Sequence, residues 1–144
     1  MSSDSNSVIR RRWLLWRAVW RLAAASAGLR LFSFRRMQRW VGSQPAPEMG
    51  QARKSALTEK KYSPEELARA LARGSRLVPG STCLVQALAG QWLLQGEGYA
   101  PQLRIGVSKA EGFEAHAWLE LDGKVFIGDS DLQRFTPFPP VECP

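Results

Sequence analysis

The dipeptide Asp122-Gly123 separates two strand-like runs of residues, FEAHAWLEL before it and KVFIGD after it. Asp-Gly is the strongest short signal for a two-residue hairpin loop, because both central residues of such a loop need positive φ angles. A third run, QLRIGVSK from Gln102 to Lys109, alternates in the same way and precedes the others across a short AEG turn. The last third of the chain therefore predicts a small antiparallel sheet.

The two-residue loop also predicts which residues of the hairpin face each other. Counting outward from the turn gives three pairs: Leu121 with Lys124, Leu119 with Phe126, and Trp118 with Ile127. The same count places His116, the only histidine of the chain, opposite Asp129. Directly opposed side chains lie on one face of a sheet, with Cβ atoms roughly 4.5–5.5 Å apart. We therefore expect a histidine–carboxylate pair, with Asp131 as the diagonal second choice and Asp122 used by the turn.

A helix is expected in the run YSPEELARALARG, from Tyr62 to Gly74. Ser63 suits the N-cap and Glu66 completes a capping box with it, while Pro64 suits the first helical position. The glycine at the end of the run suits the helix exit. The inward face of this helix is expected to consist of Leu67, Ala70 and Leu71.

A second helix is expected from about Thr82 to Gln95, capped by Ser81 or Thr82 and ended by Gly96 and Gly98. It is apolar nearly all round, which is typical of a buried central helix. Cys83 lies in its first turn, where unpaired N–H groups and the helix macrodipole favour a thiolate and can hold an oxyanion. A cysteine in an apolar helix is more often a small core residue, so this position alone does not decide between the two roles.

Cys83, His116 and Asp129 together suit an activated thiol. The imidazole would take the thiol proton, and the carboxylate would orient the imidazole and stabilise its charged form. A lone histidine on a strand is usually a structural residue. Only the coincidence of the three features in one short chain favours nucleophilic catalysis.

The positive charge of the chain is concentrated at its N-terminus. The first 42 residues contain nine arginines and a single acid, Asp4, so this segment carries +8 in a chain of net charge +7. Tryptophan, alanine and leucine recur there at helical spacing, with several arginines on another face. The residues concerned are Trp13, Trp16, Trp20, Ala24, Ala27 and Leu31, and Arg10, Arg17 and Arg21. We expect one or two amphipathic helices, broken near Gly28 or Ser33.

This basic segment has three interpretations. In the simplest, its tryptophans pack on the core of the domain and its arginines face water. In the other two, it docks on a partner protein or acidic peptide, or attaches peripherally to an anionic membrane surface. Nucleic acid is disfavoured as a partner, because no helix-turn-helix, RNA-binding strand motif or zinc finger accompanies the charge. A transmembrane span is not expected, because arginines interrupt every long apolar run.

The stretch from Gly42 to Lys61 is polar and rich in Pro, Gly and Ser, which indicates a linker. We therefore expect a basic helical segment over residues 1–42, a linker or mobile loop over 43–61, and a second domain over 62–144. The two cysteines, Cys83 and Cys143, are too few for a disulfide framework, and no zinc-type Cys/His cluster is present. This cysteine usage fits a reducing cytoplasm.

The order of a cysteine on a central helix, a histidine in HAW and an aspartate on the next strand resembles the transglutaminase-like branch of the papain-type cysteine enzymes. Within that branch, CLVQALAGQWLLQGEGYAPQLRIGVSKAEGFEAHAWLELDGKVFIGD is similar to the stand-alone leader peptidases of lasso peptide biosynthesis. These share a C-L-x-x-[AS]-L-A helix, an L-R-I-G-V strand, an A-H-A-W-[LV]-E strand before a D-G turn, and an N-terminal part rich in arginine and tryptophan. The resemblance covers about Pro79 to Asp129 strongly, the N-terminal helices weakly, and Gly42 to Lys61 not at all.

The resemblance implies an α+β, papain/transglutaminase-like fold, with N-terminal helices and a central cysteine-bearing helix packed on a small antiparallel sheet. It implies a cysteine peptidase that removes the leader from a ribosomally made precursor peptide, without a metal or cofactor. The family's nucleophile falls on Cys83, its general base on His116 and its orienting acid on Asp129, although Asp131 lies close by.

The implied partners are the precursor peptide, a small leader-recognition protein and an ATP-dependent cyclase. The chain has no room for a leader-binding winged-helix module beside the peptidase, which fits the split form of such systems. Two alternatives remain. One is a transglutaminase-like acyltransferase that passes the acyl group to an amine, and the other is a non-catalytic basic adaptor domain.

Overall fold

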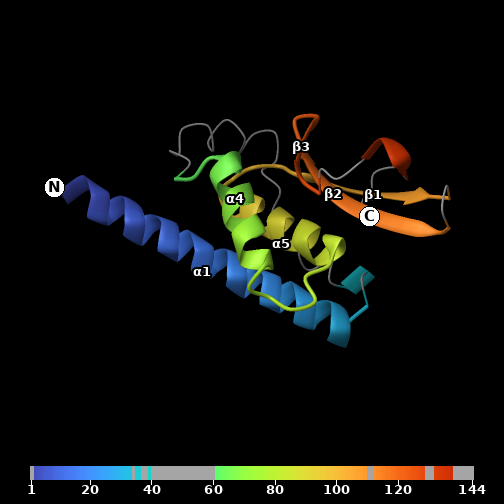
Figure 1. Cartoon of the computed structure of the whole chain (residues 1–144), viewed down its shortest axis with the longest axis horizontal. Coiled ribbons are helices and arrows are strands. Elements are labelled where there is room, and N and C mark those ends of the chain that lie inside the picture. Colours follow the sequence, from blue (N-terminus) through green and yellow to red (C-terminus); the bar gives the residue numbers. More distant parts are fainter. Residues whose placement is uncertain are drawn as a thin grey trace.

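The computed structural model of the chain describes residues 2–33, 35, 36, 39, 61–109, 112–128 and 132–137. Its elements are α1 (Ser2–Leu31), α4 (Pro64–Ser75), α5 (Cys83–Gln95), β1 (Gln102–Ser108), β2 (Glu114–Leu121), β3 (Lys124–Ile127), a 3-10 turn η1 (Leu132–Arg134) and β4 (Thr136–Pro137). The strands form one antiparallel sheet in the order β3-β2-β1-β4, and α5 lies between α1 and this sheet (Figure 1). The expected α+β architecture, with helices packed on a small antiparallel sheet, is confirmed.

The start of α4 follows from local chemistry. The Ser63 hydroxyl accepts a hydrogen bond from the Glu66 amide, and the Glu66 carboxylate accepts one from the Ser63 amide, so the expected capping box is complete. The exit was expected at Gly74, but the helix continues to Ser75. Gly74 instead lies against α1, where an added Cβ would come within 3.1 Å of Leu22. Its lack of a side chain therefore serves helix packing.

The expected central helix is confirmed as α5. Thr82 is its N-cap, with the hydroxyl accepting from the Val85 amide, and the helix ends before Gly96. Helices α1 and α4 and strand β2 all pack against it, which explains why it is apolar nearly all round. Its buried residues are Val85, Ala87, Leu88, Ala89, Gly90, Leu93 and Leu94.

The described part of the N-terminal segment contains one long helix, α1, and the face that this helix buries is not the one that its tryptophans suggested. The core stripe of α1 consists of Leu14, Ala18, Leu22 and Ala25, each at most 4% exposed. The tryptophans Trp13, Trp16 and Trp20 are 53–62% exposed, so the expectation that they pack on the core is wrong. The physical reason is the close approach of α1 to α4 at Gly74, because a stripe of alanine and leucine fits there and indole rings do not.

Helix α1 belongs to the same hydrophobic core as the rest of the described chain. Its core stripe lies in one cluster with apolar residues of α4, α5 and the strands. The expected division into residues 1–42, 43–61 and 62–144 stays a prediction, because most of the expected linker lies outside the described residues. In the ranges that the structure describes, no helix has the length and apolar character needed to cross a membrane.

The hairpin turn is confirmed, but part of the expected register is wrong. Asp122 and Gly123 have φ angles of 51° and 78°, and the two residues that flank them pair as expected. Further out, Leu119 pairs with Ile127 rather than Phe126, because the pairing shifts between Leu119 and Glu120. The extra residue in β3 is a bulge, and it also excludes the expected pairing of Trp118 with Ile127.

The bulge has a clear packing cause. Phe126 and Ile127 are neighbours in sequence, and both pack against the core under the helices. Strict alternation would turn one of them to the other face of the sheet, whereas one inserted residue keeps both on the core side. Ile127 lies so close to α5 that a Cβ added at Gly90 would overlap its side chain.

Candidate active site

Cys83 is the first residue of α5 and packs, partly buried, against the edge of the core. The Val85 amide is bound by the Thr82 hydroxyl, and the Gln86 amide by the Thr82 carbonyl. Helix geometry leaves the amides of Cys83 and Leu84 without an acceptor inside the helix. No acidic residue lies in this first turn. The helix start therefore offers N–H donors beside the thiol, with no carboxylate in that turn to compete for them.

His116 lies on β2 opposite Gly106 of β1. Its Nε2 is 2.9 Å from the carbonyl oxygen of Gly128, which follows β3 directly. Two aromatic rings flank the imidazole, Trp118 with a centroid distance of 6.3 Å and Phe135 with one of 5.1 Å. The half-buried ring is thus held from the end of β3, from its own strand and from the segment before β4.

The contact with Gly128 determines the tautomer of His116. A carbonyl oxygen only accepts hydrogen bonds, so Nε2 carries the proton and Nδ1 of the neutral ring keeps the free lone pair. Gly128 has a φ of 83°, and a Cβ there would lie 2.8 Å from the Ala117 carbonyl oxygen. Only glycine therefore lets the chain approach β2 closely enough for this hydrogen bond.

Cys83 and His116 belong to different sides of the sheet. Helix α5 covers the face of the sheet on which Ala117 and Leu119 are buried. Side chains alternate along a strand, so His116 and its neighbour Trp118 project from the opposite face. Within the described residues, no hydrogen bond joins the thiol of Cys83 to the imidazole of His116.

The carboxylates expected at the site, Asp129 and Asp131, and the second cysteine of the chain, Cys143, fall outside the part of the chain that the structure describes. The pairing of His116 with Asp129 was counted from a register that holds only next to the turn, since the bulge shifts it by one residue before Ile127. The hydrogen bond that orients His116 in the described structure is accepted by the carbonyl oxygen of Gly128, the residue before Asp129. Among the described residues, no group of three or more His, Cys, Asp or Glu side chains is suited to hold a metal ion.

Sequence reasoning missed a polar network beside the imidazole. The Trp118 indole N–H donates to Glu120 Oε1 over 2.8 Å, and Arg104 Nε donates to Glu120 Oε2 over 3.3 Å. Arg104 lies directly opposite Trp118 in the ladder, and the Trp118 ring lies over Gly106, where a Cβ would be only 2.9 Å away. The alternation of His116, Trp118 and Glu120 was the available signal, because all three share one face.

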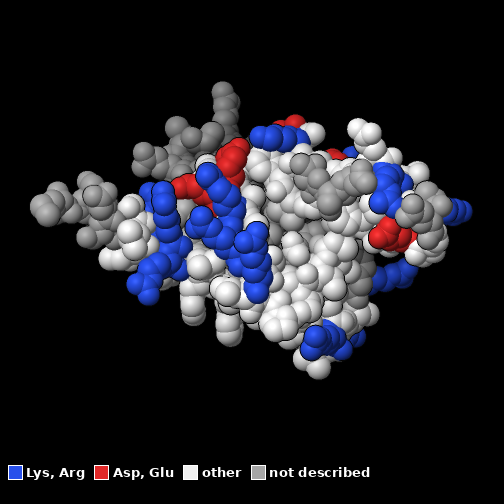
Figure 2. All heavy atoms as spheres, viewed as in Figure 1, with Lys and Arg blue, Asp and Glu red and all other residues white. Residues whose placement is uncertain are grey.

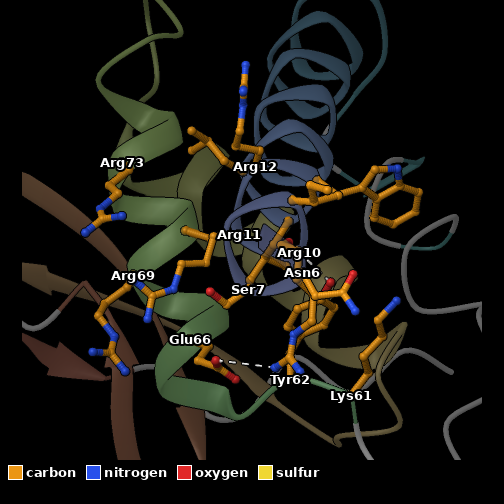
Figure 3. Close-up of a pocket in the computed structure, with 15 residues that line it drawn as sticks. Asn6, Ser7, Arg10, Arg11, Arg12, Lys61, Tyr62, Glu66, Arg69 and Arg73 are labelled. Atoms are coloured by element: carbon orange, nitrogen blue, oxygen red, sulfur yellow. Dashed lines mark hydrogen bonds and ion pairs between the residues drawn. The ribbon is translucent and has the colours of Figure 1, made fainter. Parts of the chain in front are cut away.

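A second feature is a basic groove between α1 and α4, with a volume of about 940 Å³. We use the name basic groove for the surface whose described charged residues are the cations Arg10, Arg11, Arg12, Lys61, Arg69 and Arg73 and the carboxylate Glu66. Figure 2 shows Lys and Arg side chains gathered over these two helices. In the close-up, Arg10 and Arg11 extend from α1, and Arg69 and Arg73 from α4 (Figure 3).

Among the described residues that line the basic groove, positive charge is in excess, because the one carboxylate is already used. Glu66 is 3.6 Å from Arg10 and also caps α4 through the Ser63 amide. Tyr62 is 2% exposed and lies beneath Arg10 and Lys61, whose charged groups are 5.1 and 5.6 Å from its ring centroid. The arrangement suits a negatively charged segment of a peptide or protein.

Two arginines of α1 contact the rest of the protein. The interpretation in which the arginines of this segment face water is therefore wrong for these two. Arg17 forms an ion pair with Glu97 at 2.8 Å, and Arg21 donates to the Trp92 carbonyl oxygen over 2.8 Å at the end of α5. The pKa of Arg21 is lowered to about 10, chiefly by burial and also by the charge of Arg17, while Glu97 opposes the shift. These arginines therefore tie α1 to the C-terminal end of α5.

A model of the Transglutaminase-like superfamily, whose members are typically cysteine hydrolases and transferases, matches residues 28–139. No curated protein and no solved structure matches the chain. The matched range contains α4, the cysteine-bearing helix α5 and all four strands, and it makes up most of the sequence. The chain belongs to the Transglutaminase-like superfamily.

Proposed function

We propose that this protein is a cysteine peptidase that removes the leader from a ribosomally made lasso peptide precursor. The observation that carries the proposal is a thiol at the first turn of the central helix, beside backbone amides that have no acceptor inside the helix, in a chain of the Transglutaminase-like superfamily. The strand sequences LRIGV and AHAWLE, which resemble those of lasso leader peptidases, support the finer assignment.

In this proposal Cys83 is the nucleophile and His116 the base. Nδ1 of His116 takes the thiol proton, because Nε2 already donates to Gly128. The sulfur attacks the scissile carbonyl carbon, the amides of the α5 start stabilise the oxyanion, and the imidazolium returns its proton to the leaving amine as the C–N bond breaks. Water activated by His116 then hydrolyses the thioester, which releases the leader's carboxylate and restores the thiol.

The proposal requires the imidazole and the thiol to approach each other when substrate binds. Because alternation places His116 on the face of β2 away from α5, this approach takes a rearrangement of β2 and not only the tightening of a long hydrogen bond. The basic groove supports a role for partners in this step, because its excess positive charge suits an acidic part of the leader or of a separate leader-recognition protein. A lasso cyclase would then act on the freed core peptide.

The test is a cleavage assay with the precursor peptide, the recognition protein and mass spectrometry of the products. Cys83→Ala and His116→Ala should each lower leader removal by about three orders of magnitude or more, while circular dichroism shows an unchanged fold. Cys143→Ala is the matched control, and we expect it to retain activity. An active Cys83→Ala enzyme together with an inactive Cys143→Ala enzyme would refute the assignment. Products that carry an added amine would identify an acyltransferase.

The third member of the site is tested by two aspartate variants. Asp129→Asn should lower turnover by about two orders of magnitude with little change in stability, because an amide keeps the volume but loses control of the imidazole. Asp131→Asn should have a much smaller effect. The reverse ranking would assign the orienting role to Asp131. If neither variant changes turnover, the Gly128 carbonyl alone orients the imidazole.

A non-catalytic adaptor is the second candidate, and a specific observation favours it. His116 and Cys83 are associated with opposite faces of the sheet, and the imidazole is held by Gly128 and two aromatic rings. If the protein supports leader removal by another enzyme, alkylation of its thiols should leave that activity intact. The adaptor is excluded if alkylation of the wild type abolishes the activity and alkylation at Cys143 alone does not.

A further inference from the structure

The outward side of α1 carries a second apolar stripe that the core does not use. We call this the outward stripe, and it consists of Ile9, Trp13, Trp16, Trp20 and Leu31. These side chains are 53–75% exposed, and helical periodicity places them opposite the core stripe of the same helix. At about 1.5 Å per residue, the outward stripe extends over roughly 33 Å. An exposed apolar surface of this length is typical of a binding site.

The outward stripe forms a ridge of aromatic rings. Trp16 and Trp20 stack on each other, with ring centroids 6.4 Å apart and planes inclined by 11°. Arg17 approaches the Trp13 ring at 5.3 Å. Toward the end of α1, a hollow lined by Ala23, Ser26, Ala27, Arg30, Leu31 and Val78 continues the same side of the helix. The side is therefore aromatic at its centre and has cations along its borders.

Along the sequence, the charge that accompanies the outward stripe is of one sign. From Ser5 to Pro47 the sequence contains no Asp or Glu, while Arg12 and Arg30 lie on one flank of the outward stripe by helical periodicity. This pattern disfavours a second copy of the chain as the occupant, because two such helices would repel each other. It is complementary to a surface of uniform negative charge.

We propose that α1 binds the surface of an anionic lipid bilayer, lying in the plane of the interface with its outward stripe among the headgroups. Tryptophan prefers the membrane–water interface, and arginines at the border of an apolar stripe pair with anionic lipids. Helices that bind in this way combine an apolar face with basic flanks. The core stripe remains in the domain, so α4, α5 and the sheet stay on the aqueous side of α1 (Figure 1).

The first experiment uses the full chain with vesicles of phosphatidylcholine, alone or mixed with phosphatidylglycerol. The wild-type protein should sediment with the mixed vesicles and much less with the neutral ones, and added salt should weaken the binding. Tryptophan emission should shift to shorter wavelength on binding, because indole rings leave water. No cleavage takes part in this assay, so its result is independent of the proposed peptidase activity.

The second experiment tests whether the outward stripe is responsible. The combined substitution Trp13→Gln, Trp16→Gln and Trp20→Gln should weaken partition into anionic vesicles by about tenfold or more. Phe113→Gln is the matched control, because Phe113 is 78% exposed and lies outside α1. Circular dichroism and a thermal melt confirm that both variants are folded.

A third pair of variants separates position from net charge. Arg12→Gln with Arg30→Gln should weaken vesicle binding more than Arg69→Gln with Arg73→Gln, which removes the same charge from α4. Equal losses would mean that net charge alone drives binding and would overturn the assignment to this side of α1. The proposal also fails if wild type does not bind anionic vesicles, or if the tryptophan variant binds them equally well. A wild-type dimer that the tryptophan variant abolishes, without vesicle binding, would show a protein contact instead.

Discussion

Helices α1 and α5 are both rich in leucine and alanine, and α1 also carries three tryptophans, yet the two helices use their apolar residues differently. Helix α5 is packed by α1, α4 and the sheet, so its apolar residues are buried on several sides. Helix α1 packs against α4 and α5 with one side only, and its tryptophans project from the other. The apolar content of α5 is explained by folding, whereas that of α1 exceeds what folding uses. Such an excess indicates a surface for binding.

The largest expected effect separates the two sides of α1. Leu22 is fully buried, and Leu22→Ala should lower the free energy of unfolding by about 3 kcal/mol, because it leaves a cavity between α1 and α4. Trp20 is 62% exposed, and Trp20→Ala should change it by no more than about 0.5 kcal/mol. Urea denaturation measures both values. Equal losses would show that the outward stripe supports the fold as much as the core stripe does, so the two sides of α1 would not differ in role.

A smaller effect is expected where α1 meets the end of α5. Arg17 and Glu97 form an ion pair with side chains only 17% and 9% exposed, and Glu97 also offsets the burial of Arg21. Glu97→Gln should cost about 2 kcal/mol, because it leaves two partly buried cations without a countercharge. Thermal or urea unfolding measures the loss.

The matched control for Glu97 is Glu114→Gln. Glu114 lies 3.9 Å from Arg134 in an exposed pair, so the variant should shift stability much less. Similar losses in both variants would mean that the contact between α1 and α5 is no stronger than a surface ion pair.

The smallest effect concerns binding at the basic groove. Changing Arg10, Arg11 and Arg12 together to Gln should weaken binding to the leader–recognition-protein complex by about tenfold at low salt, and the difference should shrink as salt is added. Isothermal titration calorimetry across a salt series measures it. Gln at the exposed Arg35, Arg36 and Arg39 removes the same charge outside the groove and should matter less. If the triple variant binds like wild type at every salt concentration, these arginines only face solvent and do not contribute to binding.

Local sequence determined the beginnings of helices and the hairpin turn. Ser63 with Glu66, Pro64 and Thr82 predicted where α4 and α5 begin, and Asp122-Gly123 predicted the turn between β2 and β3. In each case the chemistry acts within about four residues, on backbone groups that no other part of the chain needs to supply. The α+β class follows from the same signals, and so does the position of Cys83 in the first turn of its helix.

Tertiary structure decided which faces these elements use. The sequence of α1 contains two apolar stripes, and only the close approach to Gly74 selects Leu22 over the tryptophans for the core. The bulge in β3 arises because Phe126 and Ile127 both pack under the helices. No residue near the turn predicts this bulge. His116 was predicted to face a carboxylate, but its described partner is the Gly128 carbonyl. Burial, register and hydrogen-bond partners depend on residues far apart in the chain, and local patterns cannot encode which distant surface will be present.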